Sequence, residues 1–187
     1  MKIINSIVVV LFFILGFSAA YANPAGNWLK STEQLEGDRP HTINEIKSFL
    51  QSAEPIIEAG SDNPIFWYVL GIYGKRVFGD YYRQAKRLGN YSPNNPEAQA
   101  LVKQYSFYYR KSLDANDKPN APVHLGVDEL MSIASNILIS PDIKERAYKK
   151  AIRLMQANGD AVPDGCEYTT YQFLLESYSA QKNPEKY

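Results

Sequence analysis

The chain has 187 residues, of which 45% are hydrophobic and 21% charged, so it is long and apolar enough for one folded domain. Twenty basic residues balance twenty acidic ones, which excludes a polycationic nucleic-acid binder and an acidic tail. One cysteine excludes an internal disulfide, a cysteine-based zinc cluster and a CxxC redox pair, and two histidines leave little room for a histidine-rich metal site. We therefore expect a scaffold that is not an enzyme and needs no metal or cofactor.

The first 22 residues have the pattern of an export signal. Lys2 is their only charge, residues 7–17 form an unbroken apolar run, and residues 18–22 end in the small-x-small pattern that signal peptidase reads. The run is short for a transmembrane span, although an uncleaved N-terminal anchor is the alternative. The pattern predicts cleavage before Asn23, a single α-helical domain over residues 23–187, a periplasmic or secreted location and no stable membrane anchor after cleavage.

Export constrains the single cysteine, Cys166, which has no intramolecular partner in an oxidising compartment. Asp164 and Glu167 flank it closely, and nearby carboxylates raise the pKa of a thiol and so make it less reactive. We expect a buried, inert thiol, with an intermolecular disulfide as the alternative.

Helix starts are well marked along the rest of the chain, and no long stretch alternates as a strand does. Residues 42–45 (Thr-Ile-Asn-Glu) form a capping box, and Asn63, Asn95 and Ser140 each precede a proline at a first helical position. The fold class is therefore predicted to be all-α. The expected helices are 26–36, 42–59, 64–77, 79–89, 96–115, 121–138, 141–158 and 167–182.

Three of these helices end alike, with a small residue, then Asn or Gly, then Asp and Pro, within residues 59–64, 115–119 and 157–163. Asn and Gly adopt the left-handed conformation that closes a helix, and Pro prevents its continuation. A recurring helix end that introduces another helix indicates repeated helical hairpins. Coincidence is the alternative, because these residue types end most helices.

Residues 63–71 resemble the opening of a tetratricopeptide repeat, with its Trp-x-x-Leu-Gly pattern, and residues 107–116 and 146–154 resemble the close of such a repeat. The related Sel1-like repeats share much of this pattern. The family's tyrosine would fall on Gly74, and residues 79–95 are similar to an insertion within one hairpin. The resemblance implies antiparallel helical hairpins stacked as a short solenoid that binds other proteins.

The same segments predict a helix contact on physical grounds. Trp67 and Leu70 share a helical face, and Gly71 permits a close approach of the partner helix. The face expected to receive them comprises Tyr108, Ser112 and Ala115.

Catalytic motifs are missing from the sequence. It contains no phosphate-binding glycine loop, Gly-x-Ser-x-Gly elbow or HExxH, and His41 and His124 are interpreted as structural. Glu176-Ser177 resembles the Glu-Ser of lytic transglycosylases, as residues 154–156 resemble a second motif of that family. The two occur in reversed order, and few residues follow Glu176, which is better explained as a solvated helix residue.

Charge is distributed unevenly along the chain. Residues 23–74 carry a net −4, residues 75–118 a net +5 and residues 119–187 a net −2. The basic middle is rich in tyrosine, and Arg and Tyr are enriched at binding hot spots. A solvated helix face with tyrosines in the core is the alternative interpretation.

In a tetratricopeptide register starting at Trp67, the groove side would present Tyr68, Ile72, Lys75 and Arg76, and the last hairpin Gln172 and Glu176. The resemblance implies that the Lys75–Arg76 pair holds a terminal carboxylate of a peptide. The leading hypothesis is an exported adaptor that binds a protein through an acidic or C-terminal segment, with no role for nucleic acid. A narrower version is an immunity protein for an envelope-acting toxin. The alternatives are an enzyme or accessory factor acting on cell-wall glycan, and a helical bundle that binds a small molecule.

Overall fold

The computed structural model describes residues 24–35 and 42–159, and within these ranges the chain forms helices and no strand. The predicted all-α class is therefore confirmed. The helices are α2 (Pro24–Leu35), α3 (Ile43–Ser52), α4 (Glu54–Ala59), α5 (Pro64–Arg87), α6 (Pro96–Asn116), α7 (Val127–Ala134) and α8 (Pro141–Asn158). None of these helices is long and apolar enough to cross a membrane.

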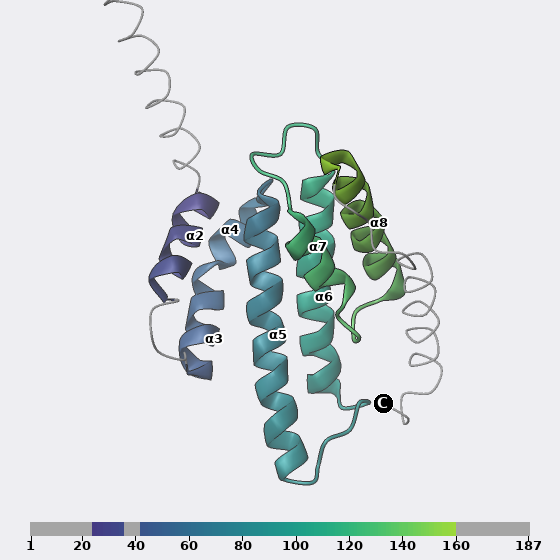
Figure 1. Ribbon diagram of the computed structural model, residues 1–187. Helices are drawn as coiled ribbons and strands as arrows, with labels where there is room; N and C mark the ends of the chain where they lie inside the picture. Colours follow the sequence, from purple (N-terminus) through teal and green to yellow (C-terminus); the bar gives the residue numbers. More distant parts are fainter. Residues whose placement is uncertain (1–23, 36–41, 160–187) are drawn as a thin grey trace, which may run out of the picture.

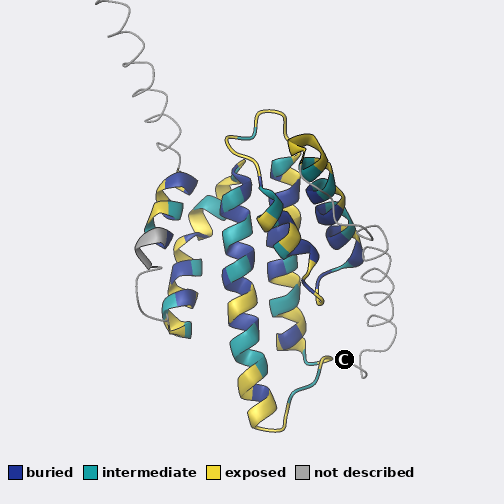
Figure 2. Cartoon of the chain, in the orientation of Figure 1, coloured by how far each residue is buried: buried dark blue, intermediate teal, exposed yellow. Residues whose placement is uncertain are grey.

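Two long antiparallel helices, α5 and α6, form the centre of the fold (Figure 1). Helices α2, α3 and α4 lie on one side of this hairpin, and α7 and α8 lie on the other. The buried residues, coloured dark blue on the cartoon of Figure 2, occur in helices on both sides of the hairpin. Their hydrophobic side chains form two clusters. Both clusters include side chains of α5 and α6, so the hairpin joins them.

The cluster on the α2–α3 side is built from stacked aromatic rings. The rings of Trp28 and Phe49 stack with centroids 4.2 Å apart, and Phe66 meets Trp28 edge-on at 5.1 Å. The indole Nε1 of Trp28 donates a hydrogen bond to Ser52 Oγ at 3.0 Å, which ties α2 to the end of α3. Aromatic pairs of this geometry stabilise a fold beyond their buried area.

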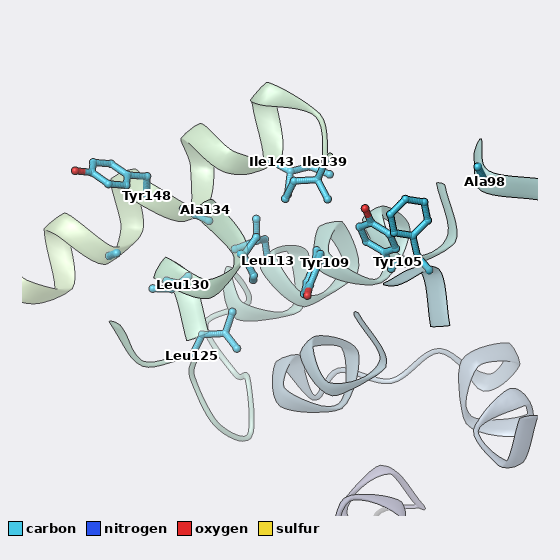
Figure 3. Packing of buried hydrophobic residues seen from close by; sticks show 14 residues of the cluster. Ala98, Tyr105, Tyr109, Leu113, Leu125, Leu130, Ala134, Ile139, Ile143 and Tyr148 are labelled. Atoms are coloured by element: carbon cyan, nitrogen blue, oxygen red, sulfur yellow. The ribbon is translucent and has the colours of Figure 1, made fainter. Parts of the chain in front are cut away.

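The cluster on the α7–α8 side is shown in Figure 3. Tyr105, Tyr109 and Leu113 lie along α6 and pack with aliphatic side chains of α7, α8 and the turn between them. Of the aliphatic side chains labelled in the figure, Leu130 and Ala134 belong to α7, Ile139 to the turn and Ile143 to α8.

Most of the predicted helix starts are confirmed. The Thr42 capping box is complete, since Glu45 N–H donates to Thr42 Oγ1 at 3.3 Å and Thr42 N–H to Glu45 Oε2 at 2.8 Å. Asn63 and Asn95 each accept hydrogen bonds from two backbone amides of the first turn. Ser140 precedes α8 as expected, but its side chain makes no capping hydrogen bond.

Of the three similar helix ends, only the third has the predicted left-handed cap, because Gly159 has ψ 14° whereas Gly60 has ψ 100°. Residues 160–163 of that third end lie outside the described residues. Gly60 and Gly159 have φ of 75° and 73°, which glycine adopts without strain. The left-handed cap expected at Asn116 is wrong, because α6 continues through Asn116 and Asp117 at its end has φ −81°. Asn116 Oδ1 instead accepts the Leu125 N–H at 2.7 Å and holds the following loop.

Two predicted helices, 42–59 and 121–138, differ from the structure for physical reasons. The segment 42–59 divides into α3 and α4 at Ala53, because Pro55 has no N–H to continue the ladder and its ring crowds the preceding turn. The segment 121–138 narrows to α7, since Pro122 and the Asn116 hydrogen bond hold residues 121–126 outside the helix. The predicted helix 167–182 lies outside the described residues.

The largest correction concerns α5. The predicted helices 64–77 and 79–89 are one continuous 24-residue helix, because neither a proline nor a capping side chain interrupts it at residue 78. Gly79 remains helical with an ordinary negative φ. Residues 79–87 therefore extend α5 instead of forming an insertion.

The predicted contact around Trp67 is confirmed. Trp67 and Leu70 are buried, and the Trp67 indole donates to Ser61 O at 2.7 Å. On α6, Tyr108, Ser112 and Ala115 are also buried, and Ser112 Oγ donates to Pro64 O at 2.7 Å. Gly71 lies against a tyrosine ring, since a Cβ added there would stand 2.5 Å from Tyr109 Cε1. The backbone of α5 thus approaches α6 at the predicted glycine.

Candidate interaction surface

One side of α5 is less buried than the other in the described part of the chain. The buried side chains of α5, among them Trp67, Leu70 and Val77, point toward α3 and α6. Tyr68, Ile72, Lys75 and Arg76 follow at intervals of four, three and one residues, which places them together on the opposite side. Tyr68 and Ile72 are half-buried, and Lys75 and Arg76 are exposed. We call these four residues the α5 face.

Tyr68 connects the α5 face to the core. Its ring centroid lies 6.3 Å from that of Tyr109, and its side chain packs against the cluster on the α7–α8 side, which we call the α6–α8 cluster. A half-buried tyrosine held from below loses little conformational entropy when it contacts a partner. Tyr68 therefore offers a partner an aromatic contact that the core already supports.

The two cations of the α5 face are not neutralised by neighbouring carboxylates. The Arg76 guanidinium carbon lies 5.2 Å from the Tyr73 ring centroid, a cation–π arrangement. Lys75 has no carboxylate within 4.0 Å in the described part of the chain. Both cations therefore present positive charge to solvent.

The continuity of α5 adds cations that belong to the basic segment 75–118 but were not among the predicted site residues. Arg83 and Lys86 continue the spacing of Lys75 and Arg76 toward the far end of the helix. Arg83 Nη2 lies 3.6 Å from Asp80 Oδ1, and Lys86 Nζ donates to the Tyr82 hydroxyl at 2.8 Å, which raises the pKa of Lys86. The absence of a proline or cap around residue 78 was the signal that could have identified this longer basic stripe.

The other predicted site residues, Gln172 and Glu176, lie outside the described residues, as do Cys166 and His41. His124 is exposed in the loop before α7. The structure therefore brings together the four predicted residues of α5 and gives no placement for the pair expected on the last hairpin.

A second charged region links α6 to α8. Arg146 Nη1 donates to Asp114 Oδ1 at 2.6 Å and Arg146 Nε to Asp117 Oδ2 at 3.2 Å, while Lys150 also pairs with Asp117. A shallow depression of about 410 Å³ lies over these groups, and Lys149 and Arg153 complete its basic side.

The arrangement of this depression is that of an interhelical clamp. Acidic and basic side chains alternate across it, and burial lowers the pKa of Lys150, with the nearby charge of Arg153 acting in the same direction. Each of its carboxylates pairs with a cation, Asp117 with Arg146 and Lys150, Glu145 with Lys149, and Asp142 with Arg110 of α6, so none of them is placed as a free general base. The clamp joins the end of α6 to α8.

Comparison with known proteins gives no assignment. No protein-family model, curated protein or solved structure matches this chain.

Proposed function

We propose that this protein is an exported adaptor that binds another protein through the α5 face, without metal or cofactor. Its partner would present an acidic segment or a C-terminal carboxylate. The observation that supports this is the alignment of two exposed cations, Lys75 and Arg76, with the half-buried Tyr68 and Ile72 on one side of α5, which the described helices leave partly exposed. Charged hydrogen bonds from cations give orientation, and an aromatic contact beside them gives affinity.

A narrower form of the proposal is an immunity protein that occludes an envelope-acting toxin. The rigid hairpin core supports it, because a surface carried on packed helices pays little ordering cost on binding. Lys75 and Arg76 would then meet acidic residues of the toxin and accelerate its capture by long-range attraction.

We also propose that the hairpins form a short solenoid related to tetratricopeptide repeats. Its support is the order α5–α6 then α7–α8, two consecutive antiparallel hairpins that share one buried cluster. The repeats would be irregular, since α5 and α6, with 24 and 21 residues, are together longer than a whole 34-residue repeat unit.

The test uses a partner captured from an envelope extract, together with acidic peptides taken from its sequence. Replacing Lys75 and Arg76 together by Ala should weaken binding by about 1–3 kcal/mol, because charge-assisted contacts are lost. Calorimetry at two salt concentrations should show that salt weakens the parent complex more than the variant complex. Folding should change little, because an exposed charge contributes about 0–1 kcal/mol.

The matched control is the Lys47→Ala/Lys103→Ala variant, which removes the same charge from exposed positions of α3 and α6. It should bind within about twofold of the parent, since its cations lie away from the α5 face. Equal affinity of both double variants would remove the α5 face from recognition.

A further inference from the structure

The most exposed large hydrophobic side chains of the described chain occupy two turns. Leu88 is 71% exposed in the turn that joins α5 to α6, and Ile137 and Leu138 are 65% and 49% exposed in the turn that joins α7 to α8. Figure 1 shows both turns directed toward the same end of the molecule, with the α5–α6 turn projecting furthest. We call this end the distal end.

The α5–α6 turn holds Leu88 in a fixed position. Leu88 N–H donates to Gln84 O at 3.1 Å, and Asn90 N–H reaches back to Ala85 O at 3.0 Å across Gly89, whose φ is 70°. The rings of Tyr82 and Tyr91 meet edge-on at 4.6 Å beside it. This is an ordered helix end of the Schellman type that presents an apolar side chain to solvent.

The α7–α8 turn is ordered in the same way. Leu138 N–H donates to Asn136 Oδ1 at 3.3 Å, and Lys144 Nζ donates to Ile137 O at 3.2 Å. No residue of the turn itself, 135–140, is charged. The aliphatic side chains of Ile137 and Leu138 therefore project from a backbone that hydrogen bonds hold in place.

Positive charge surrounds the projecting leucine. Arg83, Lys86 and Arg87 lie within one and a half helical turns of Leu88 and are all exposed. Asp80 is bonded to Arg83 and Gln84, and Glu97 is the remaining carboxylate near the turn. The α5–α6 turn therefore presents Leu88 among mainly basic side chains, with the rings of Tyr82 and Tyr91 beside it. We call Arg83, Lys86 and Arg87 its cationic collar.

We propose that the distal end docks on an anionic phospholipid membrane, with Leu88 entering the lipid and its cationic collar contacting the phosphate groups. A protein hot spot is a pocketed, contiguous cluster, whereas here the apolar groups project separately from two convex turns. A lipid surface deforms around such projections, attracts basic side chains and accommodates tyrosine at its interface. The α5 face would remain free, because Lys75 lies more than three helical turns from Leu88.

The test is co-sedimentation of the full chain with vesicles of phosphatidylglycerol and phosphatidylcholine, against vesicles of phosphatidylcholine alone. All variants carry the same N-terminus, verified by intact mass, so that a retained leader contributes equally to each. The parent should bind the anionic vesicles more tightly, and raised salt should release it. Replacing Arg83 and Arg87 together by Ala should weaken binding about 25-fold, at about fivefold per cation.

Two matched controls separate this docking from the adaptor proposal. Leu88→Gln should weaken vesicle binding about tenfold. Val123→Gln, a similar change at an exposed site in the loop that joins α6 to α7, should not, because Figure 1 shows that this loop lies at the end opposite the α5–α6 turn. Lys75→Ala/Arg76→Ala removes as much charge as the Arg83/Arg87 variant and should leave vesicle binding within about threefold. The Lys75→Ala/Arg76→Ala variant tests the adaptor proposal only when its binding to a partner protein is measured.

Equal binding to both vesicle types, or equal loss in Leu88→Gln and Val123→Gln, would overturn the proposal. So would self-association of the parent that Leu88→Gln abolishes without any vesicle binding, since the distal end would then contact a second copy of the chain. Circular dichroism of each variant ensures that a loss is not caused by unfolding.

Discussion

At the residue scale, Tyr105 combines complete burial with an unpaired polar group. Its side chain is fully buried in the α6–α8 cluster, and its hydroxyl has no hydrogen-bond partner in the described chain. Burial raises the pKa of Tyr105 well above its ordinary value of 10.0, and the neighbouring Tyr91 adds to the shift. The ring is therefore retained for packing, and the hydroxyl costs stability.

The raised pKa predicts how stability depends on alkaline pH. Below about pH 10 the phenol of Tyr105 is neutral in both the folded and the unfolded state, so it adds nothing to the pH dependence of the free energy of unfolding. Above it the unfolded chain ionises while the folded chain keeps its proton, so the free energy of unfolding falls as pH rises. Urea titrations between about pH 8 and pH 11 should show this loss.

Tyr105→Phe should be as stable as the parent at pH 7, or up to about 1 kcal/mol more stable. Its free energy of unfolding should fall less than that of the parent as pH rises above about 10. The control Tyr81→Phe removes the same atom from a half-buried site and should keep the parent's alkaline loss, because Tyr105 is still present. Identical alkaline curves for the parent and Tyr105→Phe would contradict the burial of this hydroxyl.

At the element scale, the single helix α5 contributes both the residues that pack against α3 and α6 and the residues of the α5 face. Three glycines occur along it, and each meets a different environment. A Cβ at Gly71 would stand 2.5 Å from Tyr109 Cε1 and one at Gly74 would stand 2.9 Å from Tyr105 Cβ, whereas the nearest atom at Gly79 is Arg83 Nη1 at 4.0 Å. Gly71 and Gly74 set the approach of α5 to α6, and Gly79 does not.

The same substitution should therefore have opposite effects at two positions of α5. Gly71→Ala should destabilise the protein by about 1–3 kcal/mol, because Tyr109 must be displaced from a packed core. Gly79→Ala should stabilise it by about 0.5–1 kcal/mol, because alanine favours the helix and meets no neighbour. Denaturant midpoints measure both, and a shift of the same sign at both positions would show that the α5–α6 contact is misplaced.

At the scale of the whole molecule, three layers of helices bury two clusters, and the first layer begins directly after the predicted export signal. Helix α2 starts at Pro24, and Ala25 and Trp28 are already buried. Trp28 stacks on Phe49 and bonds to Ser52, so α2 is required for the core on its side of the hairpin. Cleavage before Asn23 would remove no described residue.

This position predicts the mature N-terminus. Intact-mass measurement of the exported protein should give a chain that begins at Asn23, because the small-x-small pattern ends at Ala22. A mass that includes residues 1–22 would favour the uncleaved anchor. Cleavage beyond Trp28 would be incompatible with the stacked core, and such a product should unfold at lower denaturant concentration.

The sequence by itself determined the helical class and most helix starts of this protein. Capping side chains and prolines act within three or four residues, so Thr42, Asn63 and Asn95 mark their helices without help from distant segments. The same local periodicity placed Tyr68, Ile72, Lys75 and Arg76 on one side of α5. The burial of Trp67 and the close approach at Gly71 also followed from residue type and spacing.

Only the tertiary structure decided the shortness of α7 and the neighbours of each layer, and it settled the length of α5, for which the sequence offered only the absence of a proline or a cap near residue 78. Residues 78 and 79 give a weak local signal, and packing of Phe78 against Tyr105 of α6 keeps the helix continuous through them. The loop before α7 depends on an Asn116–Leu125 hydrogen bond, and the clamp between α6 and α8 joins residues about thirty positions apart. Such contacts form between segments distant in sequence, and their energy depends on how the whole chain packs, so local patterns do not encode them.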